Sequence, residues 1–258
     1  TVRQNGHSVA ITAVNDVERG GLSLQKTDTI TGTTPQGDAD FEGITFQIIN
    51  NSRNPVIVEG QKYQPGEVVK TLVTDAEGKA STSDDLLPYG EYILHESATN
   101  ESMLNTVPDQ TVLIEDDGVI YEFTCPNEVV RGDVLIEKRD LESGLLTPLG
   151  GASLDGTLFE ITNKSKNAVY VNGALYAPGE VCATIEVKDG IAQTENRALP
   201  YGTYEMQEVK PGEGYLHTDQ AVRHFTIRQD GQVVEYRDGD AAYNQVIRGD
   251  LQFVKVGE

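Results

Sequence analysis

The chain lacks tryptophan and has only two cysteines among its 258 residues. Cys125 and Cys182 are too few for a disulfide framework and form neither a CxxC motif nor a metal-binding spacing. We therefore expect both to be free, small apolar residues. The four histidines are scattered, with no HxxxH or HxH pair that would bring two imidazoles to one metal ion, so the sequence predicts no metal site.

Positive charge is also scarce, and this restricts the possible partners. Against 41 acidic residues there are 20 basic ones, for a formal net charge of -21 and a pI near 4.4. Such a chain is repelled by the phosphate backbone of nucleic acids and by an anionic membrane surface, so neither is expected as a partner. No run of about 18 apolar residues is present to insert into a membrane.

The chain is built from a repeated unit, which is its clearest organisational feature. The segments "NDVERGGLSLQK", "NEVVRGDVLIEK" and "NQVIRGDLQFVK" begin at Asn15, Asn127 and Asn244, with spacings of 112 and 117 residues. Between them, "LPYGEYILHE" ends at Glu96 and "LPYGTYEMQE" ends at Glu208. The same elements recur in the same order, which indicates one module used twice.

The ends of the chain match only parts of this module. We predict four segments: residues 1–19 as the closing strands of a preceding repeat, 20–131 and 132–248 as complete repeats, and 249–258 as the opening strand of a following repeat. The chain thus looks like a segment of a longer array. Residues 1–20 do not have the basic start and apolar middle of a signal peptide, but in such a segment this says little about location.

Apolar residues within a unit recur with a period of two, which favours strands over helices. Leu22, Leu24 and Lys26 alternate with polar residues, and Val134, Ile136 and Lys138 repeat the pattern. Segments rich in Gly, Pro, Asp and Asn separate these runs and favour turns. We expect an all-β protein in which each unit is a β-sandwich.

Strand alternation places three polar residues of each unit on the buried face. Glu96 follows Tyr92 and Leu94 at intervals of two residues, and Lys26 ends the apolar face that Leu22 begins. Asn127 shares a face with Cys125 in the same way, and the second unit repeats the set with Lys138, Glu208 and Asn244. Because unpaired buried polar groups cost several kcal/mol each, the three should meet. A buried ion pair with an asparagine hydrogen bond, or charges that point outward at strand ends, would also fit.

This order of a lysine closing a "GxLxLxK"-like strand, an "LPxGxYxLxE" motif and an asparagine in the last strand resembles the Cna protein B-type domains (SpaA-like, prealbumin-like) of Gram-positive pilins and surface adhesins. The resemblance implies tandem Ig-like, prealbumin-like sandwiches. It also implies a spontaneous isopeptide bond between lysine and asparagine, promoted by the glutamate. Lys26 would bond Asn127 with Glu96 assisting, and Lys138 would bond Asn244 with Glu208 assisting. Asn15 and Lys255 occupy matching positions but would stay unbonded within this chain.

The chemistry explains why these residue types would be buried together. Lysine attacks only as the neutral amine, which an apolar environment favours. A protonated glutamate could hydrogen-bond the asparagine carbonyl, stabilise the developing oxyanion and pass protons as ammonia leaves. The reaction needs no cofactor and happens once per site, so the protein would not be an enzyme in the usual sense.

The resemblance predicts rigid stalk modules of a protein that lies outside the cell, attached to the wall of a Gram-positive bacterium. Their partners would be neighbouring repeats of the same polypeptide and, as a further candidate, a host matrix or cell-surface ligand. Two other readings stay open. Exposed loops such as residues 97–110 could make the region a ligand-binding adhesin, and Lys26 with Glu96 could be the catalytic pair of an enzyme. Asp-rich turns lack the spaced ligand pattern of a calcium loop.

Overall fold

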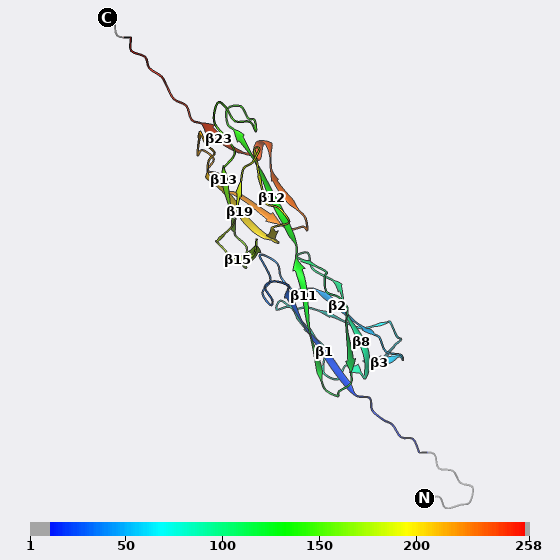
Figure 1. The fold of residues 1–258 in the computed structure, drawn as a ribbon. Coiled ribbons are helices and arrows are strands. Elements are labelled where there is room, and N and C mark those ends of the chain that lie inside the picture. The colour runs from blue at the N-terminus through cyan, green and yellow to red at the C-terminus, as the bar shows by residue number, and fades with distance from the viewer. Residues whose placement is uncertain (1–10, 256–258) are drawn as a thin grey trace, which may run out of the picture.

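The computed structural model describes residues 11–255 and shows two β-sandwiches arranged end to end (Figure 1). Its regular structure consists of β-strands and one short 3₁₀ helix within the described range. The predicted all-β class is therefore confirmed. Residues 11–18 and 247–255 leave the sandwiches at opposite ends of the elongated molecule (Figure 1).

The first sandwich contains the strands β1 (Arg19–Asp28), β2 (Thr45–Asn50), β3 (Val56–Val58), β4 (Gln61–Tyr63), β5 (Val68–Val73), β6 (Lys79–Ser81), β7 (Leu87–Pro88), β8 (Gly90–Ala98), β9 (Met103–Leu104), β10 (Gln110–Ile114) and β11 (Ile120–Val129). One sheet has the order β6-β1-β11-β9, with β7 also paired to β1. The facing sheet has the order β10-β8-β2-β5, and β3 and β4 form a separate hairpin.

The second sandwich contains β12 (Arg131–Asp140), β13 (Leu158–Asn163), β14 (Val169–Val171), β15 (Ala174–Tyr176), β16 (Val181–Glu186), β17 (Ile191–Gln193), β18 (Leu199–Pro200), β19 (Gly202–Lys210), β20 (Tyr215–Leu216), β21 (Arg223–Ile227), β22 (Val233–Tyr236), the 3₁₀ helix η1 (Asp238–Asp240) and β23 (Ala242–Val246). Its sheets have the orders β17-β12-β23-β20 and β16-β13-β19-β21. They repeat the arrangement of the first sandwich.

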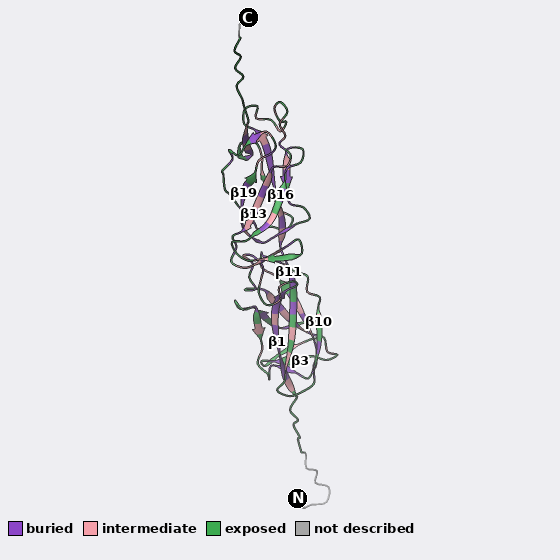
Figure 2. Cartoon of the chain, turned by 60° about the vertical axis from the view of Figure 1, so that its left-hand side comes forward, coloured by how far each residue is buried: buried purple, intermediate pink, exposed green. Residues whose placement is uncertain are grey.

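Alternating burial produces a separate apolar core in each sandwich (Figure 2). In β2 the side chains of Phe46 and Ile48 are fully buried between half-exposed neighbours, and β13 repeats this with Phe159 and Ile161. Cys125 and Cys182 are free and buried, as expected, and burial raises the pKa of their thiols to about 11 and about 12.

The repeated "LPYG" motif forms a turn, and the tyrosine two residues after its glycine stabilises this turn by a hydrogen bond. The hydroxyl of Tyr92 donates to the carbonyl oxygen of Pro88 at 2.9 Å, and that of Tyr204 donates to Pro200 at 2.8 Å. Both rings are fully buried, so each hydroxyl needs this internal acceptor. The turn fixes the start of β8 and β19, the strands that carry Glu96 and Glu208.

The longer spacing of the second repeat comes mostly from an interruption of its last strand. Thr124 alone separates Phe123 from Cys125 in β11, whereas residues 237–241, which include η1, separate Tyr236 from Ala242. The register is the same on both sides of the interruption. Cys125 pairs with Lys26 and Ala242 pairs with Lys138, so the asparagine two residues later has the same place in both units.

The two sandwiches are joined by one buried residue, Val130, between β11 and β12. A joint loop (residues 36–38) of the first sandwich also contacts the second. The backbone N–H of Asp38 donates to the Tyr201 carbonyl at 3.0 Å, and its carboxylate accepts from Thr203 Oγ1 at 2.6 Å and Arg228 Nη2 at 2.9 Å. Gly37 has φ +60°, and a Cβ there would lie 2.1 Å from the Tyr201 carbonyl oxygen. The loop therefore fits only with glycine at this position.

Candidate functional site

The first candidate site lies in the core between the two sheets of the first sandwich. Lys26 Nζ lies 2.9 Å from Glu96 Oε2, and Asn127 Nδ2 donates to Glu96 Oε1 at 2.7 Å. Lys26 and Asn127 have no exposed surface, and Glu96 is 2% exposed. The structure thus brings together the three residues that the sequence placed on inward faces.

Strand pairing explains how residues so far apart in sequence meet. β1 runs parallel to β11, and Asn127 pairs with Asp28, two residues beyond Lys26. Both side chains point to the same face of this sheet because a strand's side chains alternate. Glu96 comes from β8 in the facing sheet, where it pairs with Phe46. The site therefore links β1 and β11, the first and last strands of the sandwich in chain order, to β8 of the facing sheet.

The second sandwich repeats this geometry. Lys138 Nζ lies 2.6 Å from Glu208 Oε2, and Asn244 Nδ2 lies 2.5 Å from Glu208 Oε1. Lys138 and Asn244 have no exposed surface, and Glu208 is 1% exposed. In both sites one carboxylate bridges the lysine nitrogen and the asparagine amide nitrogen.

Burial shifts both lysines towards the neutral amine. Desolvation lowers the pKa of Lys26 and Lys138 from the ordinary value of 10.5, although the adjacent glutamate opposes the shift in each case. A lysine with a lowered pKa loses its proton more easily and becomes nucleophilic. A carboxylate that could receive this proton lies within hydrogen-bond distance of each lysine.

The glutamates face a different atom from the one that the sequence argument expected. Each carboxylate accepts from the asparagine amide nitrogen, and the expected hydrogen bond to the asparagine carbonyl oxygen is not the one formed. The physical reason is that a carboxylate is an acceptor, so it pairs with the N–H side of the amide. The position suits proton transfer from the lysine nitrogen to the leaving nitrogen.

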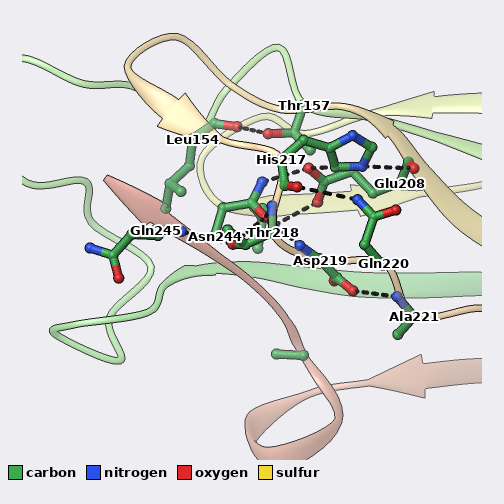
Figure 3. Close-up of polar contacts among 12 residues, drawn as sticks. Leu154, Thr157, Glu208, His217, Thr218, Asp219, Gln220, Ala221, Asn244 and Gln245 are labelled. Atoms are coloured by element: carbon green, nitrogen blue, oxygen red, sulfur yellow. Dashed lines mark hydrogen bonds and ion pairs between the residues drawn. The ribbon is translucent and has the colours of Figure 1, made fainter. Parts of the chain in front are cut away.

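The asparagine carbonyl oxygens have different surroundings in the two sites. Asn244 Oδ1 accepts from the backbone N–H groups of Thr218 and Asp219, as shown in Figure 3. Asn127 Oδ1 is buried and has no hydrogen-bond partner. Thr218 and Asp219 were missed by the sequence argument because backbone donors leave no signature in residue type. The only available signal was that the loop before β21 differs strongly from its counterpart before β10.

The two remaining predicted positions lie outside the sandwiches. Asn15 and Lys255 are exposed and belong to no strand. Within residues 11–255, no group of three or more His, Cys, Asp or Glu side chains could hold a metal ion. The same part of the chain contains no helix that is long and apolar enough to cross a membrane.

The chain belongs to the SpaA family of prealbumin-like fold domains, whose model matches residues 20–129 and 148–241. The resemblance found in the sequence is thereby confirmed. No curated protein matches the chain significantly.

Solved structures with a similar fold include the Bacillus anthracis TIE protein, with 18% identity and a TM-score of 0.57. The match covers 89% of this chain and 34% of that protein, so the chain spans about a third of its length. A Streptococcal ancillary pilin is 24% identical over 95% of this chain and 68% of its own, with a TM-score of 0.34. The shaft pilin SpaA from Lactobacillus rhamnosus GG is 15% identical over 91% of this chain and 100% of its own, with a TM-score of 0.33.

Proposed function

We propose that the two sandwiches are stalk modules of a Gram-positive cell-surface protein, each locked by a spontaneous isopeptide bond. Lys26 would bond Asn127, and Lys138 would bond Asn244. The observation that carries the proposal is a buried Lys-Glu-Asn trio that occurs twice, in equivalent positions. In each trio one carboxylate binds both the lysine nitrogen and the asparagine amide nitrogen. The repeat boundaries predicted from the sequence remain part of this proposal.

The proposed reaction balances within the trio. The neutral lysine nitrogen attacks the asparagine Cγ, a C–N bond forms, and the carbonyl oxygen carries the developing negative charge. The glutamate takes the proton that the lysine nitrogen loses and gives it to the asparagine nitrogen, which leaves as ammonia. The fold supplies proximity, which can lower the barrier by roughly 7 to 11 kcal/mol at best.

The burial of the two Lys-Glu pairs supports a bond-forming role over an enzymatic one. The side chains of Lys26, Glu96, Lys138 and Glu208 have no exposed surface, so a substrate from solution has no access to either pair. An amide formed inside the core needs no entry path, because both reactants belong to the chain.

The position of each bond suits a protein under tension. β1 and β11 are the first and last strands of the first sandwich, and Val130 leads directly from β11 to β12. Force that enters at β1 would pass through the Lys26–Asn127 bond to the next sandwich. The strands between these two residues would carry no load. The joint loop at Gln36–Gly37–Asp38 would keep the two sandwiches in line.

The proposal is tested by the intact mass of the denatured chain. Two bonds release two ammonia molecules, a loss of about 34 Da, and Glu96→Ala and Glu208→Ala should each restore about 17 Da. The matched control Glu91→Ala changes an exposed glutamate and should keep the full deficit. A wild-type chain at its full calculated mass would refute the bonds and leave two buried ion pairs.

A further inference from the structure

We propose that the backbone N–H groups of Thr218 and Asp219 form an oxyanion pocket that accelerates the Lys138–Asn244 bond, and that the first sandwich lacks this pocket. The inference rests on the proposed function and adds catalytic groups to it. It predicts that the two bonds form at different rates although their lysine, glutamate and asparagine side chains are the same.

The pocket consists of three donors around one oxygen atom (Figure 3). Asn244 Oδ1 accepts from Asp219 N at 2.9 Å, from Thr218 N at 3.2 Å and from Thr218 Oγ1 at 3.3 Å. Negative charge develops on this oxygen when the lysine attacks. The Thr218 N–H is shared with the Leu216 carbonyl oxygen at 2.9 Å, so the Asp219 N–H is the main donor. Donors that already point to the oxygen stabilise the transition state without the cost of reorganising.

A charged pair holds the turn that carries these donors. Asp219 is 8% exposed, and its Oδ1 accepts from the backbone N–H of Ala221 at 3.0 Å. Its Oδ2 lies 2.9 Å from Arg223 Nη2, which also donates to the carbonyl oxygen of Ala241 at 3.2 Å. Ala241 directly precedes β23, the strand of Asn244. Asp219 and Arg223 are therefore positioning residues, because their side chains fix the turn against the strand of the reacting asparagine.

The first sandwich has neither side chain of this pair. Asn105 Nδ2 donates to the Glu96 carbonyl where His217 Nε2 contacts the Glu208 carbonyl, so Val107 occupies the place of Asp219. Gln110 pairs with Leu94 where Arg223 pairs with Met206, so Gln110 replaces the arginine. The carbonyl oxygen of Asn127 is correspondingly buried without a donor. The attack of Lys26 on Asn127 must develop charge on an unassisted oxygen.

The test follows each bond separately in the full chain. Protein is made by cell-free synthesis, translation is stopped, and samples taken over time are denatured and digested. The branched peptides of the two bonds are then quantified by mass spectrometry. In the wild-type chain the Lys138–Asn244 bond should form at least about tenfold faster than the Lys26–Asn127 bond, since a single oxyanion donor is commonly worth ~100-fold or more.

Substitutions in the second sandwich test whether the pocket causes the difference in rate between the two bonds. Asp219→Ala and Arg223→Gln should each slow the second bond roughly tenfold and leave the first unchanged, because they displace the donors without removing them. Asp219→Asn keeps an oxygen for the Ala221 N–H and should retain more of the rate. Gln220→Ala is the control, since this exposed side chain donates to the His217 carbonyl oxygen and makes no hydrogen bond to Asp219, Arg223 or Asn244.

A gain-of-function variant makes the test independent of any folding defect in Asp219→Ala. The loop of the first sandwich is one residue shorter, so the variant replaces residues 107–110 with the five residues 219–223 of the second sandwich. This transfers the positioning pair with its own spacing and should accelerate the Lys26–Asn127 bond. Equal rates for the two bonds, or an unchanged second bond in folded Asp219→Ala, would overturn the pocket and leave the isopeptide proposal intact. If neither branched peptide forms in the wild-type chain, the proposed function itself fails.

Discussion

Lys138 Nζ and Glu208 Oε2 lie 2.6 Å apart in a core where neither side chain has any exposed surface. A buried ion pair of this kind rarely stabilises a fold beyond what apolar residues would contribute, because both charges lose their hydration. The same pair recurs in Lys26 and Glu96, 2.9 Å apart, and the proposed isopeptide bonds would consume the lysine of both pairs.

Removal of one reacting lysine should increase the length of chain that is released when a sandwich unfolds under force. In Lys26→Ala, residues 27–126 are no longer bypassed, so unfolding of the first sandwich should extend the chain by roughly 340 Å more than in the wild type, at about 3.4 Å per residue. Single-molecule force spectroscopy of the full chain measures this step directly. Lys62→Ala changes an exposed lysine and serves as the control. A wild-type trace that already contains the long step would contradict the load path.

Loss of the second bond should reduce thermodynamic stability. Lys138→Ala opens a covalent loop of about a hundred residues, and the chain-entropy model assigns such a closure about 4 to 5 kcal/mol. The variant also removes the Lys138 nitrogen that donates to the buried Glu208 carboxylate, which adds to the loss. Urea unfolding monitored by circular dichroism should show a lower midpoint for one of two transitions. Lys188→Ala removes an exposed lysine of the same sandwich and should not shift either midpoint.

The joint between the sandwiches should depend on Asp38. Asp38→Ala removes the acceptor of Thr203 Oγ1, Arg228 Nη2 and the backbone N–H of Lys166. Small-angle X-ray scattering should then show a broader distribution of end-to-end distances, while the unfolding of each sandwich stays nearly unchanged. Gly37→Ala should act in the same direction, because its Cβ would collide with the Tyr201 carbonyl. Exposed Asp84→Ala is the control, and identical scattering for all four proteins would rule out this role of the joint loop.

Acid should weaken the same joint. Burial raises the pKa of Asp38, but hydrogen bonds from Thr203, Lys166 and Arg228 outweigh it and hold the pKa below the ordinary value of 3.8. A depressed carboxyl pKa gives a contribution that is fully present above 3.8 and is lost as the pH falls through the lower folded-state value. Energy transfer between dyes on the two sandwiches should therefore stay constant from pH 7 to about 4 and change below it. Asp38→Ala should lack this transition, and a transition of equal size in that variant would assign it to other groups.

Much of the site could be predicted from the sequence because its three residues sit on strands with a period of two. Leu22, Leu24 and Lys26 share a face by local geometry alone, and the second repeat supplied an independent copy of the pattern. The orientation of the asparagine amide could not be predicted in this way. Which of its two ends meets Glu96 depends on hydrogen bonds across the core, and in the structure it is the nitrogen end.

The sequence by itself determined the repeat, the all-β class and the three inward polar residues of each unit, because these follow from local alternation and from comparison of one copy with the other. Tertiary structure alone decided that Asn244 has donors on its carbonyl oxygen while Asn127 has none. It also decided that Asp38 of one sandwich contacts Arg228 of the other. Both outcomes depend on how loops between strands are held in space, and loop backbones are fixed by contacts between residues far apart in the chain.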